Sequence, residues 1–164
     1  MRKSLVLLLC IIGYSKTVEG QEPTHRHSAQ RQFSLLRPFK NPIALPDEVL
    51  HTLANDVNVT TSGCGSDPIT NSWFEASNIE LKDGTLALLV KAKNGCLFGA
   101  NIGPFWIFTK TADGYSPVLQ VSALSLEILS SRTKDHRDIR VGAVSAGRSV
   151  FVIYKFDGSK YNET

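Results

Sequence analysis

One short polar run contains the residue types that acid–base catalysis uses. Asp135, His136 and Asp138 lie there beside Arg137, and Arg140 follows shortly after. An imidazole close to carboxylates can accept and donate a proton near neutral pH. The same run also fits a solvated turn at the mouth of a strand, in which Asp and Arg side chains pair. Both interpretations stay open at the level of sequence.

Paired carboxylates are the second catalytic possibility. A glycoside hydrolase needs two acidic side chains flanking the scissile bond. The chain offers several candidates for such a pair: Glu75, Glu80, Asp83 and Glu127. Spacing in sequence does not establish which of them meet in a folded sheet. The chain has none of the short motifs that mark serine hydrolases, zinc proteases or phosphate-binding loops, so no catalytic residue is assigned.

Metal and cofactor chemistry has little support in the sequence. His25 and His27 could bind a metal weakly, but a zinc site needs a third and a fourth ligand, which this segment lacks. Gly99, Asn101 and Gly103 indicate a bend of the backbone rather than a phosphate cradle, because no helix begins after them. We therefore expect neither a metal ion nor a cofactor.

Several aromatic side chains and one amide could form a binding surface for an unidentified protein or glycan. They are Trp73, Trp106, Tyr115, Tyr154 and Asn101. On a glycan, the rings would stack on sugar faces while amides supply hydrogen bonds. The alternative is that these rings fill the core and pair across neighbouring strands.

The cysteines suggest an exported chain. Cys10 falls in an N-terminal apolar run, and a cut after that run leaves Cys64 and Cys96. An even number of cysteines in an exported protein suggests a single disulfide. Two buried free thiols are the alternative. The bond would close a loop of roughly 30 residues, for which chain entropy predicts about 3.5–4 kcal/mol of stabilisation.

Residues 1–20 have the parts of a signal peptide. Arg2 and Lys3 supply a positive start, Leu5–Ile12 is an uninterrupted apolar run, and small side chains precede a cut before Gln21. The apolar run is shorter than the roughly 20 residues that cross a bilayer as a helix. We therefore expect no transmembrane segment and a mature chain that is periplasmic or extracellular.

Charge and composition divide the remaining chain in two. Without residues 1–20 the chain is close to neutral, so no strong field points to nucleic acid or to a membrane surface. Residues 21–45 are mildly basic, rich in proline and poor in apolar side chains. Such a segment could hardly bury enough surface to offset its ordering entropy, so we predict a flexible basic tail. A docking arm for an anionic surface is the alternative. Residues 46–164 are then the folded domain.

One helix is predicted, over Pro46–Asp56. Asp47 lies where the helix dipole favours negative charge, and Val49, Leu50 and Leu53 share one face. A helix this short is marginal alone, so its apolar face must lie against something apolar.

Strands alternate with turn residues along the rest of the chain. Val57–Thr61 is short and β-branched, and Ser130–Asp138 is predicted as the longest late loop. About seven strands are expected between Asp-Gly and Asn-Gly turns or similar signals: Trp73–Leu81, Leu86–Ala92, Phe105–Lys110, Tyr115–Ala123, Leu124–Leu129, Ile139–Ala143 and Val150–Phe156. Leu86–Val90 and Phe105–Phe108 are apolar on successive residues, so both faces of each should be covered.

These elements predict a mostly antiparallel β fold of the α+β class. The strands would form a sandwich or a curled sheet, with the one N-terminal helix packed on it. A parallel α/β fold would need crossover helices, and no second helix is predicted. The apolar face of the predicted helix is the natural cover for one face of the central strands.

Several motifs occur in a fixed order between Leu45 and Tyr161: L-P-D-E-V-L, W-F, a D-G turn, N-G-C-L-F-G-A-N-I-G-P-F-W-I-F, R-D-I-R and Y-K-F-D-G-S-K-Y. This order resembles a group of small exported bacterial proteins of unknown function. The segment before the first D-G turn in that group often has the acidic spacing of calcium-binding repeats. Here Ile79 and Leu81 occupy the ligand-spaced positions, and hard cations need oxygen ligands. The resemblance implies export and a β-rich fold, and it implies no activity.

The sequence therefore favours an exported, non-enzymatic binding or structural domain. The alternatives are a cell-wall or glycan hydrolase, and a proteinaceous inhibitor of a secreted enzyme. Two acidic side chains that converge in one cleft would favour the hydrolase. An exposed loop that inserts toward a partner would favour the inhibitor.

Overall fold

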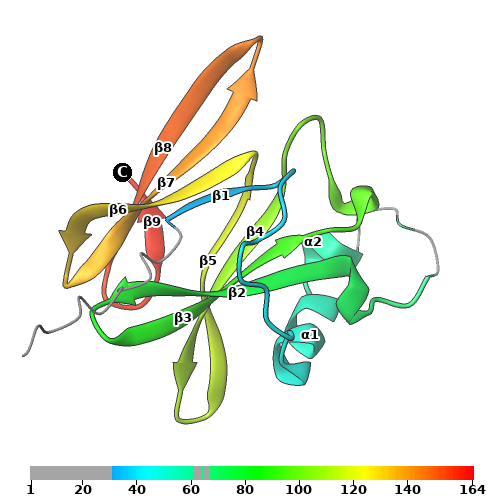
Figure 1. The fold of residues 1–164 in the computed structure, drawn as a ribbon, viewed down its shortest axis with the longest axis horizontal. Coiled ribbons are helices and arrows are strands. Elements are labelled where there is room, and N and C mark those ends of the chain that lie inside the picture. The colour runs from blue at the N-terminus through cyan, green and yellow to red at the C-terminus, as the bar shows by residue number, and fades with distance from the viewer. Residues whose placement is uncertain (1–30, 61–63, 65–66) are drawn as a thin grey trace, which may run out of the picture.

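The chain forms two antiparallel β-sheets with helices on one side. The structure is a computed structural model, which describes residues 31–60, 64 and 67–164. The strands in this part of the chain are β1 (Gln32–Ser34), β2 (Phe74–Lys82), β3 (Thr85–Ala92), β4 (Gly103–Thr111), β5 (Gly114–Ala123), β6 (Ser125–Thr133), β7 (His136–Ser145), β8 (Arg148–Phe156) and β9 (Tyr161–Glu163) (Figure 1). The helices are α1 (Asp47–Ala54) and α2 (Val57–Thr60), with 3-10 turns at Asn71–Trp73 and Gly95–Leu97. The predicted mostly antiparallel β fold is confirmed.

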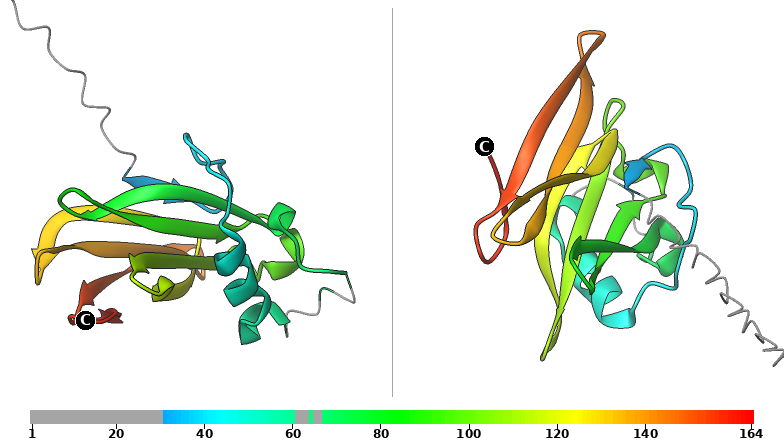
Figure 2. Two further views of the ribbon diagram at one scale, coloured as in Figure 1. Left: turned by 90° about the horizontal axis from the view of Figure 1, so that it is seen from below. Right: turned by 60° about the vertical axis from the view of Figure 1, so that its left-hand side comes forward.

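The two sheets meet where the chain passes directly from β5 into β6. One sheet has five strands in the order β1-β6-β7-β8-β9, and the other has four in the order β2-β3-β4-β5. Leu124 lies at the crossing point, where its N–H donates to the carbonyl of Gly142 at 2.8 Å and its carbonyl accepts from Leu35 at 2.9 Å. The sheets pack face to face in layers, as the views of Figure 2 show.

The central strands of the four-stranded sheet are covered on both faces, as predicted. Leu89 and Ile107 are paired neighbours on β3 and β4 and contribute to the core between the sheets. Val90 and Trp106, the next pair, contribute to a second core beneath the helices. Leu86 is the exception, because it is 59% exposed at the start of β3.

The predicted helix covers the outer face of the four-stranded sheet. Val49 and Leu53 are completely buried in the second core. The chain just beyond α1 is tied to the same sheet, because the indole N–H of Trp106 donates to the Asp56 carboxylate at 3.1 Å. The predicted disulfide is present as well, between Cys64 and Cys96, whose Cα atoms are 5.3 Å apart.

The prediction of a flexible tail over residues 21–45 is wrong from Gln32 onward. Gln32–Ser34 is strand β1, paired with β6, and Phe33, Leu35 and Phe39 are all buried. These apolar residues have no regular period, because Phe33 enters the core from a strand of three residues and Leu35 and Phe39 enter it from the irregular segment that follows. The folded domain therefore begins well before the predicted boundary at residue 46, while residues 21–30 lie outside the described residues.

Two local predictions are also wrong. Val57–Thr61, expected as a β-branched strand, begins with helix α2, whose residues Val59 and Thr60 donate N–H bonds to the carbonyl of Asp56. Ser130–Asp138, expected as a loop, is mostly strand, because β6 and β7 are joined by a tight turn at Lys134 and Asp135. Both turn residues have positive φ, 50° and 66°, which suits a two-residue hairpin but lacks the usual glycine signal.

Replacement of Leu53 tests how much the sheet depends on its helical cover. Leu53→Asp would bury a carboxylate in an apolar core, at a cost of several kcal/mol. Since net stabilities are about 5–15 kcal/mol, we expect a large fall in the melting temperature. Thr52→Asp, at the exposed neighbouring position, should melt close to the parent. Equal melting of both variants and the parent in a thermal scan would show that the helix does not support the sheet.

Candidate binding surface

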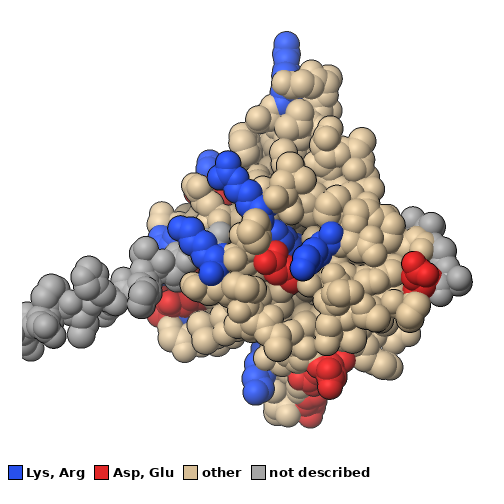
Figure 3. Space-filling view, turned by 45° about the vertical axis from the view of Figure 1, so that its right-hand side comes forward, with Lys and Arg blue, Asp and Glu red and all other residues tan. Residues whose placement is uncertain are grey.

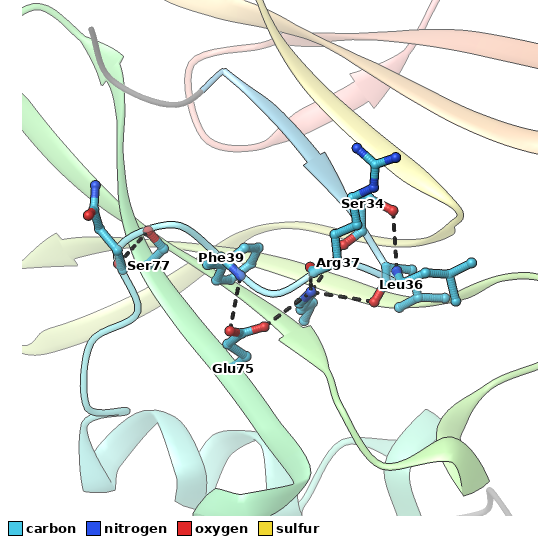
Figure 4. A network of polar contacts seen from close by, with 9 residues as sticks. Ser34, Leu36, Arg37, Phe39, Glu75 and Ser77 are labelled. Carbon is cyan, nitrogen blue, oxygen red and sulfur yellow. Dashed lines mark hydrogen bonds and ion pairs between the residues drawn. The ribbon is translucent and has the colours of Figure 1, made fainter. Parts of the chain in front are cut away.

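The segment that follows β1, residues 35–43, is called the N-terminal segment below. It is attached to the sheets by a buried ammonium group. Lys91 of β3 is 2% exposed, and its Nζ lies 3.1 Å from Oε2 of Glu75 on β2. The same Nζ donates to the carbonyl oxygens of Ser34, at 3.0 Å, and of Arg37. It also stands 4.7 Å from the centre of the Phe39 ring (Figure 4). A buried charge is tolerated only with such partners, so the lysine fixes the backbone around it.

Further contacts continue this attachment along β2. The second carboxylate oxygen of Glu75 accepts the N–H of Phe39 at 3.0 Å. Ser77 donates its hydroxyl to the carbonyl of Asn41 at 3.1 Å, and the N–H of Ile43 bonds to the β2 backbone at 2.9 Å. The segment is therefore bound to one edge of the four-stranded sheet while β1 belongs to the other sheet.

The attached segment borders a groove of about 1130 Å³, whose remaining walls come from β6, β7 and β8. Charged and aromatic side chains of its lining are Arg31, Arg37, Lys40, Glu127, Arg140 and Phe151. Four of these six side chains are cationic and one is acidic. Figure 3 shows Lys and Arg side chains gathered on one face of the molecule, with few acidic side chains among them.

Contacts within the groove order some of these groups and leave others available. Arg140 forms an ion pair with Glu127, and its guanidinium lies 5.2 Å from the centre of the Phe151 ring. Gly142 makes room for that ring, because a Cβ there would lie 3.0 Å from one of the ring carbons. Arg31 and Arg37 have no ion pair within the described residues. The guanidinium of Arg37 extends away from Glu75 (Figure 4), so the surface carries uncompensated positive charge.

The predicted acid–base residues do not form a catalytic arrangement. Asp135 lies exposed in the β6–β7 turn. His136 stacks on Phe156, with ring centres 3.9 Å apart, and its Nδ1 lies 2.9 Å from the carbonyl of Lys134. Asp138 is buried, and in the described part of the chain its Oδ1 has no hydrogen-bond partner. The imidazole is thus bound to backbone, and neither carboxylate orients it.

The predicted aromatic surface is wrong as well. Trp73 and Trp106 are buried in the core beneath the helices, and Tyr115 packs against the same core. Tyr154 packs instead against the core between the sheets. Asn101 is exposed, with a φ of 66°. The first three residues thus share one core while Tyr154 belongs to the other, so the five residues do not form one exposed surface.

Three of the four candidate carboxylates for glycoside hydrolysis are held by cations. Glu75 binds Lys91, and Glu127 binds Arg140. Asp83 binds Arg132 and Arg137, and the Arg132 guanidinium lowers the pKa of that carboxyl below its usual range. These three acids thus belong to separate ion pairs. Glu80, the fourth candidate, lies beside Asp83 and also lowers the pKa of that carboxyl.

Comparisons with known proteins add no assignment. The chain matches no family model, no curated protein and no solved structure at a significant level. The resemblance to small exported bacterial proteins therefore remains a prediction. Among the described residues, no helix is long and apolar enough to cross a membrane, and no group of three or more His, Cys, Asp or Glu side chains could hold a metal ion.

The groove contains residues that the sequence prediction placed in a flexible tail. The signal for them was present, because residues 21–45 were recognised as basic and a docking arm for an anionic surface was one alternative. Arg31, Arg37 and Lys40 are part of that basic segment. What could not be found was their position beside Arg140 and Phe151, which follows from the pairing of β1 with β6.

Removal of the Lys91 ammonium should loosen the segment and destabilise the fold. Breaking a buried ion pair from one side leaves the other charge uncompensated, which costs about 3–5 kcal/mol. We expect Lys91→Met to lower the free energy of unfolding in urea by about that amount and to expose Arg37 to trypsin. The variant Lys93→Met, which alters an exposed lysine close to Lys91 on the chain, serves as the control. The double variant with Glu75→Gln should recover part of the loss, and a Lys91→Met protein as stable as the parent would contradict this role.

Tyr161 should make the protein sensitive to high pH. Burial, and secondly the charge of Asp138, raise the pKa of this phenol, whose hydroxyl donates to the carbonyl of Arg137 at 2.9 Å. Below about pH 10 both the folded and the unfolded chain keep this proton. Above it the unfolded chain releases the proton first, so the free energy of unfolding falls as the pH rises. Urea titrations from neutral to alkaline pH should show a shallower fall for Tyr161→Phe, and equal slopes would refute the assignment.

Proposed function

We propose that the chain is an exported, non-catalytic binding domain whose ligand-contacting surface is the groove beside the N-terminal segment. Its ligand is an acidic polymer, which carries carboxylate, sulfate or phosphate groups. The observation that carries the proposal is the concentration of Arg31, Arg37, Lys40 and Arg140 around one groove with a single acidic side chain.

The chemistry of the lining suits repeated anionic groups. Guanidinium groups offer a fixed fork of N–H donors that matches carboxylates and phosphates. Phe151 adds an apolar surface next to Arg140 on which a sugar ring or an apolar side chain can rest. The pairing of Glu75, Asp83 and Glu127 with cations supports binding rather than hydrolysis as the activity of this domain.

Export is part of the proposal. It is supported by the signal-peptide pattern of residues 1–20 and by the Cys64–Cys96 disulfide, a bond that persists mainly in oxidising compartments. The domain would then act in the periplasm or outside the cell, on an acidic glycan or an acidic protein.

Binding to defined acidic polymers tests the proposal. We expect poly-glutamate or polygalacturonate to bind in calorimetric titrations, whereas neutral dextran should not. Added salt should weaken binding, because the screening length falls to about 10 Å at 0.1 M ionic strength. The double variant Arg37→Glu with Lys40→Glu should bind about tenfold more weakly.

The control places the same kind of charge reversal elsewhere. Lys110 is exposed near the end of β4, outside the groove, so Lys110→Glu should keep the parent affinity. Equal losses in both proteins would mean that net charge alone governs binding. No binding of either acidic polymer by the parent protein would overturn the proposal.

A further inference from the structure

The edges of both sheets are protected against additional pairing. β1 and β9 are only three residues long. β5 contains Pro117, next to a shift in its register with β4. Part of β2 is covered by the N-terminal segment, through the N–H groups of Phe39 and Ile43. Short strands, proline, bulges and covering segments are how soluble proteins prevent unwanted strand addition.

β8 has a stretch of edge that lacks such protection. Its last residues, Tyr154–Phe156, pair with β9, and the N–H of Thr164 reaches the carbonyl of Ile153 at 3.0 Å. Before these positions, Arg148–Val152 pairs with β7 on one side, and the described part of the chain supplies no strand on the other. This stretch presents free backbone donors and acceptors to solvent.

The side chains at this edge favour strand addition. Val150 is 45% exposed and Phe151 is 57% exposed, while Ser149–Tyr154 contains neither a charged residue nor a proline. Figures 1 and 2 show the β7–β8 hairpin projecting away from the rest of the molecule. A projecting, β-branched and uncharged edge is a template for another extended chain.

Charge indicates which extended chain would fit. From Ile139 to Phe156 the hairpin has no acidic residue. Arg148 and Lys155 of β8 are cationic, whereas Arg140 of β7 is already paired with Glu127. A second copy of β8 would add the same cations and no acidic side chain to pair with them. A strand with glutamate or aspartate side chains would instead place opposite charges beside them, and opposite charges on paired strands are favourable.

We propose that the free edge of β8 over Arg148–Val152 binds an extended acidic segment of a partner protein by strand addition. Main-chain hydrogen bonds supply affinity, and contacts to Val150 and Phe151 together with the flanking cations supply selectivity. This site shares Phe151 with the groove. It goes beyond the acidic-polymer binding proposed there, because it requires a peptide backbone.

A short capped peptide in which glutamate and valine alternate is the probe. We expect it to shift the NMR signals of the Ser149–Val152 amides of the full mature chain and to slow their hydrogen exchange. The same peptide with lysine in place of glutamate should do neither. Val150→Glu, which puts a like charge on the edge, should weaken binding of the acidic peptide about tenfold.

Matched variants separate this site from its alternatives. Val144→Glu alters an exposed position of the same hairpin on β7, the strand that pairs with β8 on the side away from its free edge, and should keep the parent affinity. If Arg37→Glu abolished binding of the acidic peptide and Val150→Glu did not, the peptide would bind in the groove and the inference would be overturned. Self-association of the free protein that disappears with Val150→Glu would identify a second copy as the occupant, and the absence of any amide shift would also refute acidic strand addition.

Discussion

The buried ammonium of Lys91 is the constraint on which the N-terminal half of the architecture depends. Its position on β3 faces the space between the two sheets, where an isolated charge would cost several kcal/mol. The carboxylate of Glu75 and the carbonyls of Ser34 and Arg37 remove that cost only if the segment after β1 lies across the sheet. Desolvation of one side chain thus fixes the path of a segment that has little regular structure of its own.

The parts of the fold that could be predicted are those in which local pattern and tertiary position agree. Successive apolar residues in Leu86–Val90 and Phe105–Phe108 required cover on both faces, and the helix face with Leu53 supplied it. The segment with Phe33 and Phe39 could not be predicted in this way, because its burial comes from a distant lysine and from pairing with β6. Such contacts leave no periodic pattern of apolar residues in the local sequence.

The site was harder to predict than the fold because its residues are gathered by sheet pairing. Large aromatic residues were the natural candidates for a binding surface, yet Trp106 is needed to fill the core beneath the helices. The β6–β7 hairpin was missed because its turn uses Lys134 and Asp135 at positive φ in place of glycine. In that hairpin the imidazole of His136 bonds to the carbonyl of Lys134 and stacks on Phe156.

The way in which the N-terminal segment is attached leaves the guanidinium of Arg37 available for a ligand. Lys91 binds the backbone carbonyl of Arg37, not its side chain, so the guanidinium can point outward into the groove. A main-chain attachment is independent of the side chain that the residue carries, and a substitution at Arg37 can therefore change the charge of the groove without removing the anchor. The attachment of the segment and the charge of the groove are thereby separated within one short stretch, as the binding function proposed here requires.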